Sequence, residues 1–493
     1  MSGEQIIVID EGTTSTRAIL FAADGRKIAS AQRPLTQHYP RAGWVEHDAA
    51  EIWDLTLACT REMVAKAGGA DAVAAIGITN QRETVVFWDK RTGEPLAPAI
   101  VWQDRRTAAE CDTLKQAGHE ADIQAKTGLL LDPYFSGSKI GWALANWPQL
   151  KQAGAHLAVG TVESYLTYRL TLGAAGGAHI SDAANASRTA LMDIEAGDWD
   201  TALCDLFGVP PSILPDITDC AGRLADTDAD LLGGAISITG MAGDQQAATI
   251  GQGCLDPGQT KATYGTGAFV LSHTGTRRPH SKNRLLSTIC WQIGGERSYA
   301  LEGSIFVAGS LIQWLRDDLN LIEHSSETTD IARSVADNGG VYLVPALSGL
   351  GAPHWQPGAS AMIHGLSFAS GKAHIIRAAL EAMAYQTHDL KTAFAADGAD
   401  WAELKVDGGM SANDWMTQDI CNMIDLPVER PEFIETTALG AAMLAAVGAG
   451  LYASLKDAQV MRGAIQQFAP DMADGTRQAR LAGWRDAMSR VLA

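Results

Sequence analysis

The sequence predicts an α/β protein built from two similar domains, and three observations lead to this prediction. The chain opens with a run of β-branched residues, 6–9, which is typical of a strand buried on both faces. Strand-like segments then alternate with helix-like segments, as in α/β proteins. A stretch near the middle of the chain, 261–270, has the same plan as the opening stretch, and 493 residues are enough for two such domains with full cores.

The opening strand ends at Asp10, and a glycine and four hydroxyl residues follow within six positions. Gly12 permits a tight bend that brings amide N–H groups close to an anion, and the side chains that follow are further donors. The pattern fits a phosphate cradle in which Asp10 holds the Mg²⁺ that accompanies a nucleotide. A β-hairpin turn whose side chains satisfy local backbone groups fits it equally well. The donors are Thr13, Thr14, Ser15 and Arg17.

The rest of the first half continues the alternation of strands and helices. A helix with Ile52, Leu55 and Cys59 on one face follows a pair of antiparallel strands, and a further buried strand comes next. Polar residues gather just beyond the ends of the later strands, which is where ligands bind in open α/β sheets. The expected strands are 18–21, 27–32, 73–79, 85–88 and 99–102, with polar segments at 80–84 and 103–106.

The second half repeats features of the first. Gly265 and Thr266 take the places of Gly12 and Thr13, so each half is expected to offer its own phosphate hairpin. Two similar domains facing each other across a cleft would form a clamp for a nucleotide.

The ends of the two halves also correspond. The segments 243–253 and 438–450 are both rich in small residues and are expected to form helices that pack against each other. Because no Lys or Arg occurs from residue 224 to residue 260, we place the boundary near Gly251, which gives domains 1–251 and 252–493. Similarity of composition alone is the alternative explanation for this apparent repeat.

Two glycine-to-helix junctions in the second half are further candidates for ligand binding. Gly309 opens a helix whose free N–H groups suit an anion or a ribose, but Ser310 and Gln313 also match a capping box that needs no ligand. Gly409 permits close backbone approach and Asn413 can meet a base edge. A plain strand-turn-helix connection capped by Ser411 explains that segment equally well.

The charge balance limits the partners of this protein. A net charge of −19 and a pI near 5.0 argue against a nucleic-acid or anionic-membrane surface, because phosphate backbones require clustered Lys and Arg. Any phosphate site must therefore be local, and we expect no nucleic-acid partner.

The cysteines and the apolar segments bear on location. Seven cysteines lack any spacing typical of disulfide frameworks or zinc sites, and residues 1–5 lack the basic flank and apolar core of a signal peptide, so we expect a cytoplasmic protein. The uncharged segment 436–455 is long enough to cross a bilayer. Its many Ala and Gly residues favour a buried helix instead, so we expect no membrane span.

Taken together, these motifs resemble the FGGY family of carbohydrate kinases, and within it the members that act on glycerol. The resemblance implies two actin-like (ribonuclease H-like) domains, as in hexokinase and the heat-shock ATPases, with a nucleotide cleft between them. It also implies ATP-dependent phosphorylation of glycerol to sn-glycerol 3-phosphate, a step that feeds glycerol catabolism and glycerolipid synthesis, with Mg²⁺ as cofactor. The matching segments are DEGTT (10–14), GWVEHD (43–48), ITNQRET (78–84), VWQ (101–103), DPYFS (132–136), NASRT (185–189), AGDQQ (242–246), YGTG (264–267), QWLRD (313–317) and DGG (407–409).

The resemblance also implies roles for individual residues. Asp244 would be the catalytic base, although an aspartate just before a helix is also a preferred N-cap. Glu11 departs from the family, which usually has Gln there, and a second carboxylate should repel phosphates unless it turns away or faces Mg²⁺. The implied glycerol-binding residues are Arg82, Glu83, Trp102, Tyr134, Asp244, Gln245 and Phe269. The implied residues for ATP or ADP are Thr13, Thr14, Ser15, Arg17, Thr266, Gly309, Gln313, Gly409 and Asn413, with Asp10 for the metal.

The side-chain chemistry agrees with a polyol. Arg82 brings only donors, while Glu83 and Asp244 bring only acceptors, so together they can satisfy hydroxyl groups in both senses. Without the resemblance, Arg82 and Glu83 would be interpreted as a solvated loop pair, and Trp102 and Phe269 as ordinary core.

Two other functions compete with the main one. A kinase of the same family acting on a longer polyol or a ketose, such as erythritol or xylulose, would carry similar motifs. A nucleotide switch of the actin or heat-shock type would hydrolyse ATP without needing a polyol pocket. We also expect a homo-oligomer, either a dimer or a tetramer.

One loop bears on regulation. Some bacterial members that act on glycerol are inhibited by fructose 1,6-bisphosphate through a basic, glycine-rich loop, and others are activated by phosphorylation of a histidine in the same region. The corresponding stretch here, 227–235, has no Lys, Arg or His. Asp226, Asp228 and Asp230 would repel a bisphosphate, so we expect neither form of control through this loop.

Overall fold

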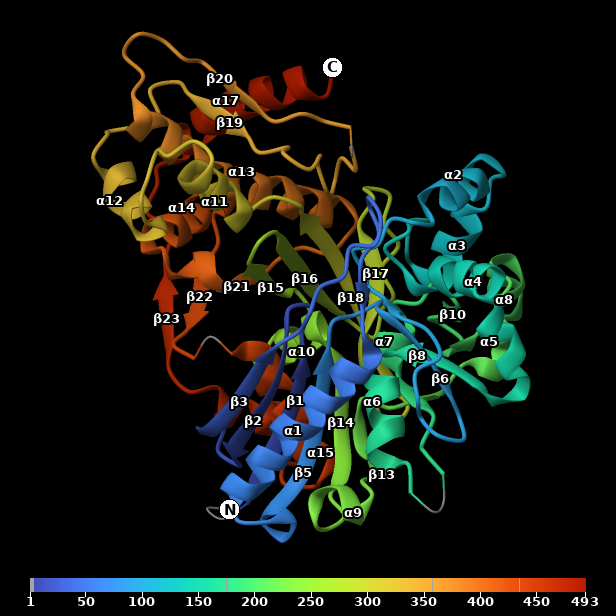
Figure 1. Ribbon diagram of the computed structural model, residues 1–493. Helices are drawn as coiled ribbons and strands as arrows, with labels where there is room; N and C mark the ends of the chain where they lie inside the picture. The colour runs from blue at the N-terminus through green and yellow to red at the C-terminus, as the bar shows by residue number, and fades with distance from the viewer. Residues whose placement is uncertain (1–3, 174–175, 357, 434) are drawn as a thin grey trace.

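A computed structural model describes residues 4–173, 176–356, 358–433 and 435–493. Figure 1 shows two α/β lobes, with the first half of the chain in blue to green and most of the second half in yellow to red. Within the described residues, 13 strands form one continuous sheet that runs through both lobes. The predicted α/β class is confirmed.

The predicted internal repeat is confirmed by the strand order. Each half contains five neighbouring strands in which the first two pairings are antiparallel and the next two are parallel. In the first half these are β3 (Lys27–Pro34), β2 (Ser15–Ala22), β1 (Gln5–Glu11), β5 (Val73–Asn80) and β14 (Ser237–Gly243). In the second half they are β18 (Glu296–Ile305), β16 (Ala268–Gly275), β15 (Gln259–Tyr264), β21 (Glu403–Asp407) and β22 (Val428–Pro431).

Three more strands complete the large sheet, and a smaller sheet lies in the first half. The additional strands are β17 (Leu286–Ile293), β13 (Ala221–Asp226) and β23 (Ile465–Phe468). The four-stranded sheet has the order β4 (Glu46–His47), β7 (Ala99–Ile100), β6 (Val85–Asp89) and β8 (Leu157–Thr161). The strand predicted at 99–102 is therefore shorter than expected. The chain leaves the ladder before Trp102, whose backbone N–H donates instead to Thr84 Oγ1 at 3.1 Å.

The first strand separates two layers of core. Ile7 and Ile9 pack with the face of α1 (Ala49–Ala67) that carries Ile52 and Cys59, as predicted, and Leu55 is partly buried there. Ile6 and Val8 point to the opposite side and pack with α15 (Thr436–Gly448). Because side chains alternate along a strand, Asp10 and Glu11 at its end must also face opposite sides of the sheet.

Two small-residue helices pack backbone to backbone, as predicted. A Cβ atom on Gly251, in α10 (Asp244–Gly251), would overlap the carbonyl oxygen of Thr436, and one on Gly440 would overlap that of Ala247. Helix α15 belongs to the second half in sequence, but it lies in the lower lobe behind β1 and β5 (Figure 1). The apolar segment 436–455 is thus α15 plus a turn. None of the helices within the described ranges has the length and apolar character needed to span a membrane.

The remaining helices surround these sheets. In the first half they are α2 (Ala108–Gln116), α3 (Glu120–Thr127), α4 (Ser136–Asn146), α5 (Pro148–Ala153), α6 (Val162–Thr171), α7 (Ala183–Ala186), α8 (Thr201–Phe207) and α9 (Ala229–Leu232). In the second half they are α11 (Gly309–Asp317), α12 (Thr328–Arg333), α13 (Lys372–Ala396), α14 (Asp414–Ile424), α16 (Leu455–Ala458) and α17 (Asp474–Val491). Short strands complete the fold: β9 (Ile180–Asp182), β10 (Met192–Asp193), β11 (Asp198–Trp199), β12 (Asp216–Thr218), β19 (Tyr342–Val344) and β20 (Met362–His364).

Candidate active site

A small polar cavity of about 40 Å³ lies where the two halves meet. The first half contributes the loops after β5 and β7 and the start of α10, and the second half contributes β16. All seven residues predicted to bind the polyol line this cavity, together with Thr13. They are Arg82, Glu83, Trp102, Tyr134, Asp244, Gln245 and Phe269.

Asp244 is not the helix cap that the alternative interpretation required. Gly243 occupies the N-cap position of α10, and Asp244 is the first helical residue, with 36% of its side chain exposed. Its Oδ1 lies 3.3 Å from Arg82 Nε and accepts a hydrogen bond from the N–H of Gln245 at 2.7 Å. The positive end of the helix dipole also favours a carboxylate there. Asp244 is therefore held in place at the cavity wall.

Arg82 and Glu83 are not a solvated loop pair. Their side chains are only 2% and 1% exposed, and Glu83 adopts a left-handed backbone conformation with φ of 64°. Such a conformation costs about 1–3 kcal/mol for a residue other than glycine, and it is concentrated at functional sites. Both charges are paired by residues distant in sequence, since Arg188 Nε donates to Glu83 Oε1 at 2.7 Å and Arg82 Nη1 donates to Glu302 Oε2 at 2.6 Å.

The ionisation of this buried cluster follows from its pairing. Burial raises the pKa of Glu302, but the guanidinium groups of Arg188 and Arg82 outweigh that effect and hold the pKa at about 2. Burial likewise raises the pKa of Glu83, against the lowering effect of the same two arginines. Opposite charges in a low-dielectric site stabilise each other in this way.

Aromatic side chains form the apolar side of the cavity. Trp102 and Tyr134 meet edge to face with ring centroids 5.5 Å apart. The indole Nε1 of Trp102 donates to Thr13 Oγ1 at 2.9 Å. Thr13 was predicted to contact the nucleotide, and the structure places it in the wall of the small cavity.

A second cavity, of about 510 Å³, lies in the second half. It is enclosed by the β15–β16 turn, the start of α11 and the segment after β21. The N–H of Gly309 donates to Gly265 O at 2.8 Å, and a Cβ atom on Gly309 would lie 2.6 Å from that oxygen. The five nucleotide residues predicted in this half all line the cavity: Thr266, Gly309, Gln313, Gly409 and Asn413.

The alternative helix caps in this region are not formed as proposed. Helix α11 starts after Ala308 without a side-chain cap, and Ser310 Oγ donates to Thr266 O at 3.0 Å, so there is no capping box with Gln313. Helix α14 is capped by Asn413 and not by Ser411. Asn413 Oδ1 accepts from the N–H of Met416 at 3.1 Å.

The remaining residues of the first hairpin lie in neither cavity. Thr14 is exposed, and Ser15 Oγ accepts from Gln32 Nε2 at 2.9 Å. Arg17 is ion-paired with Glu435 at 2.6 Å and with Asp10. Contact of these three residues with phosphates remains a prediction.

Asp10 is the residue predicted to hold the metal. Burial raises the pKa of its carboxyl, Arg17 lowers it, and the carboxylates of Glu435 and Asp244 raise it again. Asp10 and Glu435 therefore share Arg17, and the Asp244 carboxylate adds a third negative charge nearby. Within the described ranges, no group of three or more His, Cys, Asp or Glu side chains has the arrangement of a metal site. Mg²⁺ binds through one or two carboxylates plus waters and substrate phosphates, so the surplus negative charge at Asp10 fits that ion.

Glu11 turns away from the cavities, which resolves the departure noted above. Its Oε2 accepts hydrogen bonds from Thr56 Oγ1 at 2.9 Å and from Thr16 Oγ1, on the α1 side of the sheet. Burial raises the pKa of Glu11 to about 8, so the carboxyl is mostly protonated at pH 7. A protonated carboxyl at this position is uncharged, as a glutamine side chain would be.

Comparison with known proteins agrees with this geometry. Residues 5–251 match the N-terminal domain of the FGGY family of carbohydrate kinases, and residues 260–449 match its C-terminal domain. The chain belongs to this family. Glycerol kinase of Gluconobacter oxydans is 51% identical over 490 residues, which cover 99% of this chain and 95% of that protein. Glycerol kinase of Rhodospirillum rubrum is 52% identical over 490 residues, which cover 99% of this chain and 98% of that protein. The crystal structure of Plasmodium falciparum glycerol kinase with ADP matches with a TM-score of 0.93 at 36% identity over 99% of this chain and 98% of that one.

Three buried charged residues beside the site of this FGGY kinase were not predicted. Arg188 and Glu302 pair with the polyol residues, and Lys261 Nζ donates to Thr263 Oγ1 at 3.0 Å and to Gln245 Oε1. The sequence carried a signal for one of them, because Lys261 is the only charged residue of β15 and a charge in a buried strand is costly unless it is paired.

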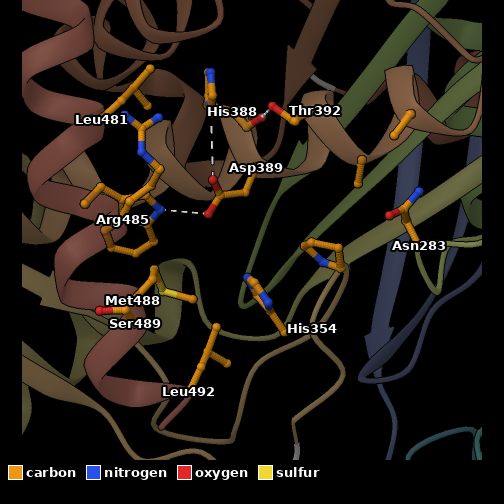
Figure 2. Close-up of a pocket in the computed structure, with 14 residues that line it drawn as sticks. Asn283, His354, His388, Asp389, Thr392, Leu481, Arg485, Met488, Ser489 and Leu492 are labelled. Carbon is orange, nitrogen blue, oxygen red and sulfur yellow. Dashed lines mark hydrogen bonds and ion pairs between the residues drawn. The ribbon is translucent and has the colours of Figure 1, made fainter.

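Another cavity of about 450 Å³ lies between α13 and α17, as Figure 2 shows, and contains none of the predicted residues. There the indole Nε1 of Trp484 donates a hydrogen bond to Asp389 Oδ2 at 2.7 Å. The polar groups of this cavity are thus partly satisfied by one another.

Proposed function

We propose that the protein transfers the γ-phosphoryl group of ATP to glycerol, giving sn-glycerol 3-phosphate and ADP. The observation that carries this proposal is the small cavity, which collects every residue predicted for glycerol and no other charged side chain. Relatives more than 50% identical over nearly the whole chain are glycerol kinases, which supports the same substrate.

The small cavity suits a three-carbon polyol. Arg82 supplies donors, and Glu83 and Asp244 supply acceptors, so hydroxyl groups find partners in both senses. Trp102 and Phe269 cover the carbon chain. A volume of about 40 Å³ corresponds to roughly three water-sized positions. A cavity this small is filled more readily by a short polyol than by a five-carbon ketose.

Asp244 is proposed as the general base. An alcohol is a weak nucleophile at neutral pH, so the attacking hydroxyl must lose its proton as the new P–O bond forms and the bond to the ADP oxygen breaks. Asp244 accepts that proton. Arg82 Nε, 3.3 Å from Asp244 Oδ1, keeps the carboxylate directed at the polyol.

The large cavity is proposed to hold ATP. Its volume of about 510 Å³ fits a nucleotide, and Thr266 and Gly309 bring a hydroxyl and a helix N-terminus to its edge. The β15–β16 hairpin contributes Thr266 to this cavity and Phe269 to the polyol cavity, so it connects the two sites. Thr13, Thr14, Ser15 and Arg17 would complete the phosphate side from the first domain.

Mg²⁺ is proposed as the cofactor, and Asp10 would hold it directly or through water. When bound, it would neutralise the charge that develops on the transferred phosphoryl group. Asp10 lies in β1 and Asp244 begins α10 directly after β14, and the negative charge of Asp244 raises the pKa of Asp10.

The remaining proposals concern organisation. We propose a division into domains 1–251 and 252–493, a cytoplasmic location, and a homo-oligomer, either a dimer or a tetramer. Light scattering on the purified full-length chain measures the oligomeric state directly, and a monomer would refute the last proposal.

A coupled assay for ADP tests the function. Purified protein with Mg-ATP is given glycerol, erythritol, xylulose or no polyol, and the product with glycerol is identified with a stereospecific sn-glycerol 3-phosphate dehydrogenase. Turnover is expected with glycerol far above the other conditions. Equal ADP release without polyol would instead indicate a nucleotide switch, and a preference for xylulose or erythritol would indicate a different sugar kinase.

A further inference from the structure

A ring of four buried charges lies beneath the polyol cavity. Arg82, Glu83, Arg188 and Glu302 have side chains between 0% and 2% exposed, and their charges sum to zero. Only Arg82 and Glu83 line the cavity, while Arg188 and Glu302 lie behind them. Arg82, Glu83 and Arg188 belong to the first half, and Glu302 comes from β18 in the second half.

Glu302 fixes the orientation of Arg82. Its Oε2 accepts from Arg82 Nη1 at 2.6 Å, and its Oε1 accepts from Arg82 Nη2 at 3.2 Å. Both terminal nitrogens of the guanidinium are therefore occupied on one edge. The Nε edge is left toward Asp244, 3.3 Å away.

Arg188 fixes the orientation of Glu83 in the same way. Its Nε donates to Glu83 Oε1 at 2.7 Å, and its Nη2 donates to Glu302 Oε1 at 3.0 Å. Within the part of the chain that the structure describes, Glu83 Oε2 accepts no hydrogen bond. That oxygen is the one left for a ligand in the cavity.

We propose that Arg188 and Glu302 are positioning residues for the polyol: they hold Arg82 and Glu83 so that one donor edge and one carboxylate oxygen face the substrate. Buried ion pairs rarely add net stability, because desolvation cancels much of their attraction, so four such charges need a reason beyond holding the fold. Because Glu302 belongs to the second half, the polyol site is complete only when both halves are in place. This inference rests on the proposed function.

The test compares the full-length protein with E302Q, R188M and the double variant E302Q/R188M. Each single change leaves the buried ring with one net charge, whereas the double variant is neutral again. We expect E302Q to raise the KM for glycerol about 10- to 100-fold, as for losing a charged hydrogen bond, and to change the KM for ATP less than about twofold. The double variant should regain much of the thermal stability that R188M loses but keep the high glycerol KM.

Asp419→Asn is the matched control. Arg480 holds Asp419 in a similar two-point ion pair, at 2.6 and 2.8 Å, between α17 and α14, and neither residue lines either cavity. Its loss should lower the thermal midpoint without changing the glycerol KM.

The outcomes separate the possible explanations. If the glycerol KM of the double variant returns to the wild-type value along with its stability, or if D419N raises that KM equally, the ring is only structural and the inference is wrong. A neutral double variant also keeps the test valid if a charged single variant does not fold. If the wild-type protein shows no polyol-dependent turnover, both the proposed function and this inference are wrong. If the wild-type protein turns over normally and E302Q leaves the KM for glycerol unchanged, only this inference is wrong.

Discussion

Replacing Glu11 with Gln should change how the stability of the protein depends on pH. In the folded protein, burial raises the pKa of this carboxyl from its ordinary 4.5 to about 8, against the smaller lowering effects of Thr16 and Thr56. The folded state therefore retains a proton between these two values that the unfolded state releases. Stability derived from this group is complete below pH 4.5 and is lost as the pH rises toward 8.

The size of the effect follows from the two pKa values. Each pH unit between them costs the wild-type protein about 1.4 kcal/mol of unfolding free energy. Between pH 5 and pH 8 the sum is about 3.5 kcal/mol, because titration is only partial near each of the two pKa values. Gln at position 11 cannot titrate, so the variant should gain that much relative to wild type over this range.

Urea unfolding followed by tryptophan fluorescence at pH 5, 6, 7 and 8 measures this difference, because the rest of the titratable background is the same in both proteins. Thr56→Val removes one hydroxyl that stabilises the Glu11 carboxylate, so it should raise the folded-state pKa further and extend the loss of stability to higher pH. A difference between wild type and Glu11→Gln that stays constant from pH 5 to 8 would show that Glu11 is already ionised in the folded state.

Four further outcomes are expected. Asp244→Asn should lower turnover by about two to four orders of magnitude while ADP binding by calorimetry is retained, and near-normal turnover would remove Asp244 from the chemistry. Arg82→Ala should weaken glycerol binding by about 1–3 kcal/mol with little change in the KM for ATP, and the reverse pattern would assign this loop to the nucleotide. Gly309→Ala should weaken ADP binding roughly 10- to 100-fold, because the added Cβ would lie 2.6 Å from Gly265 O and displace the start of α11. Unchanged ADP affinity would mean that the nucleotide binds elsewhere. Millimolar fructose 1,6-bisphosphate should leave the glycerol-dependent rate unchanged through loop 227–235, and inhibition that persists in saturating ATP would contradict this.

Much of the lining of the small cavity was predictable because several of its residues sit in short motifs just past strand ends. Arg82 and Glu83 follow β5, and Asp244 and Gln245 follow β14, where an open α/β sheet brings ligand-binding side chains together. The family resemblance supplied the role of each residue, and the strand pattern alone left every one of them with a structural alternative.

The partners behind the lining could not be predicted. Arg188 meets Glu83 across 105 positions and Glu302 across 114, and sequence periodicity carries no information about such pairings. The exact residue that caps a helix was also left open by the sequence. The cap of α14 is Asn413 and not Ser411, because the 3-10 turn at Gly409–Ala412 delays the start of the helix.

The two repeated hairpins show how one supersecondary structure supports two different tasks. In the first, Asp10 lies opposite Arg17 across the β1–β2 pair, so the hairpin carries an ion pair beside its turn. In the second, Thr263 lies opposite Phe269 across the β15–β16 pair, and the same place is uncharged and aromatic. The first hairpin can therefore present an acid to a metal, whereas the second can pass between a nucleotide and the carbon side of a polyol.

The turns of these two hairpins also lie at different cavities. Thr13 accepts a hydrogen bond from Trp102 in the wall of the polyol cavity. Thr266, its counterpart in the repeat, lines the proposed nucleotide cavity. A phosphoryl group transferred between the two cavities would thus pass between equivalent turns of the two halves. In the proposed reaction Asp244 as the base and Asp10 as the metal ligand both belong to the first half, which would place them on the acceptor side of the transfer.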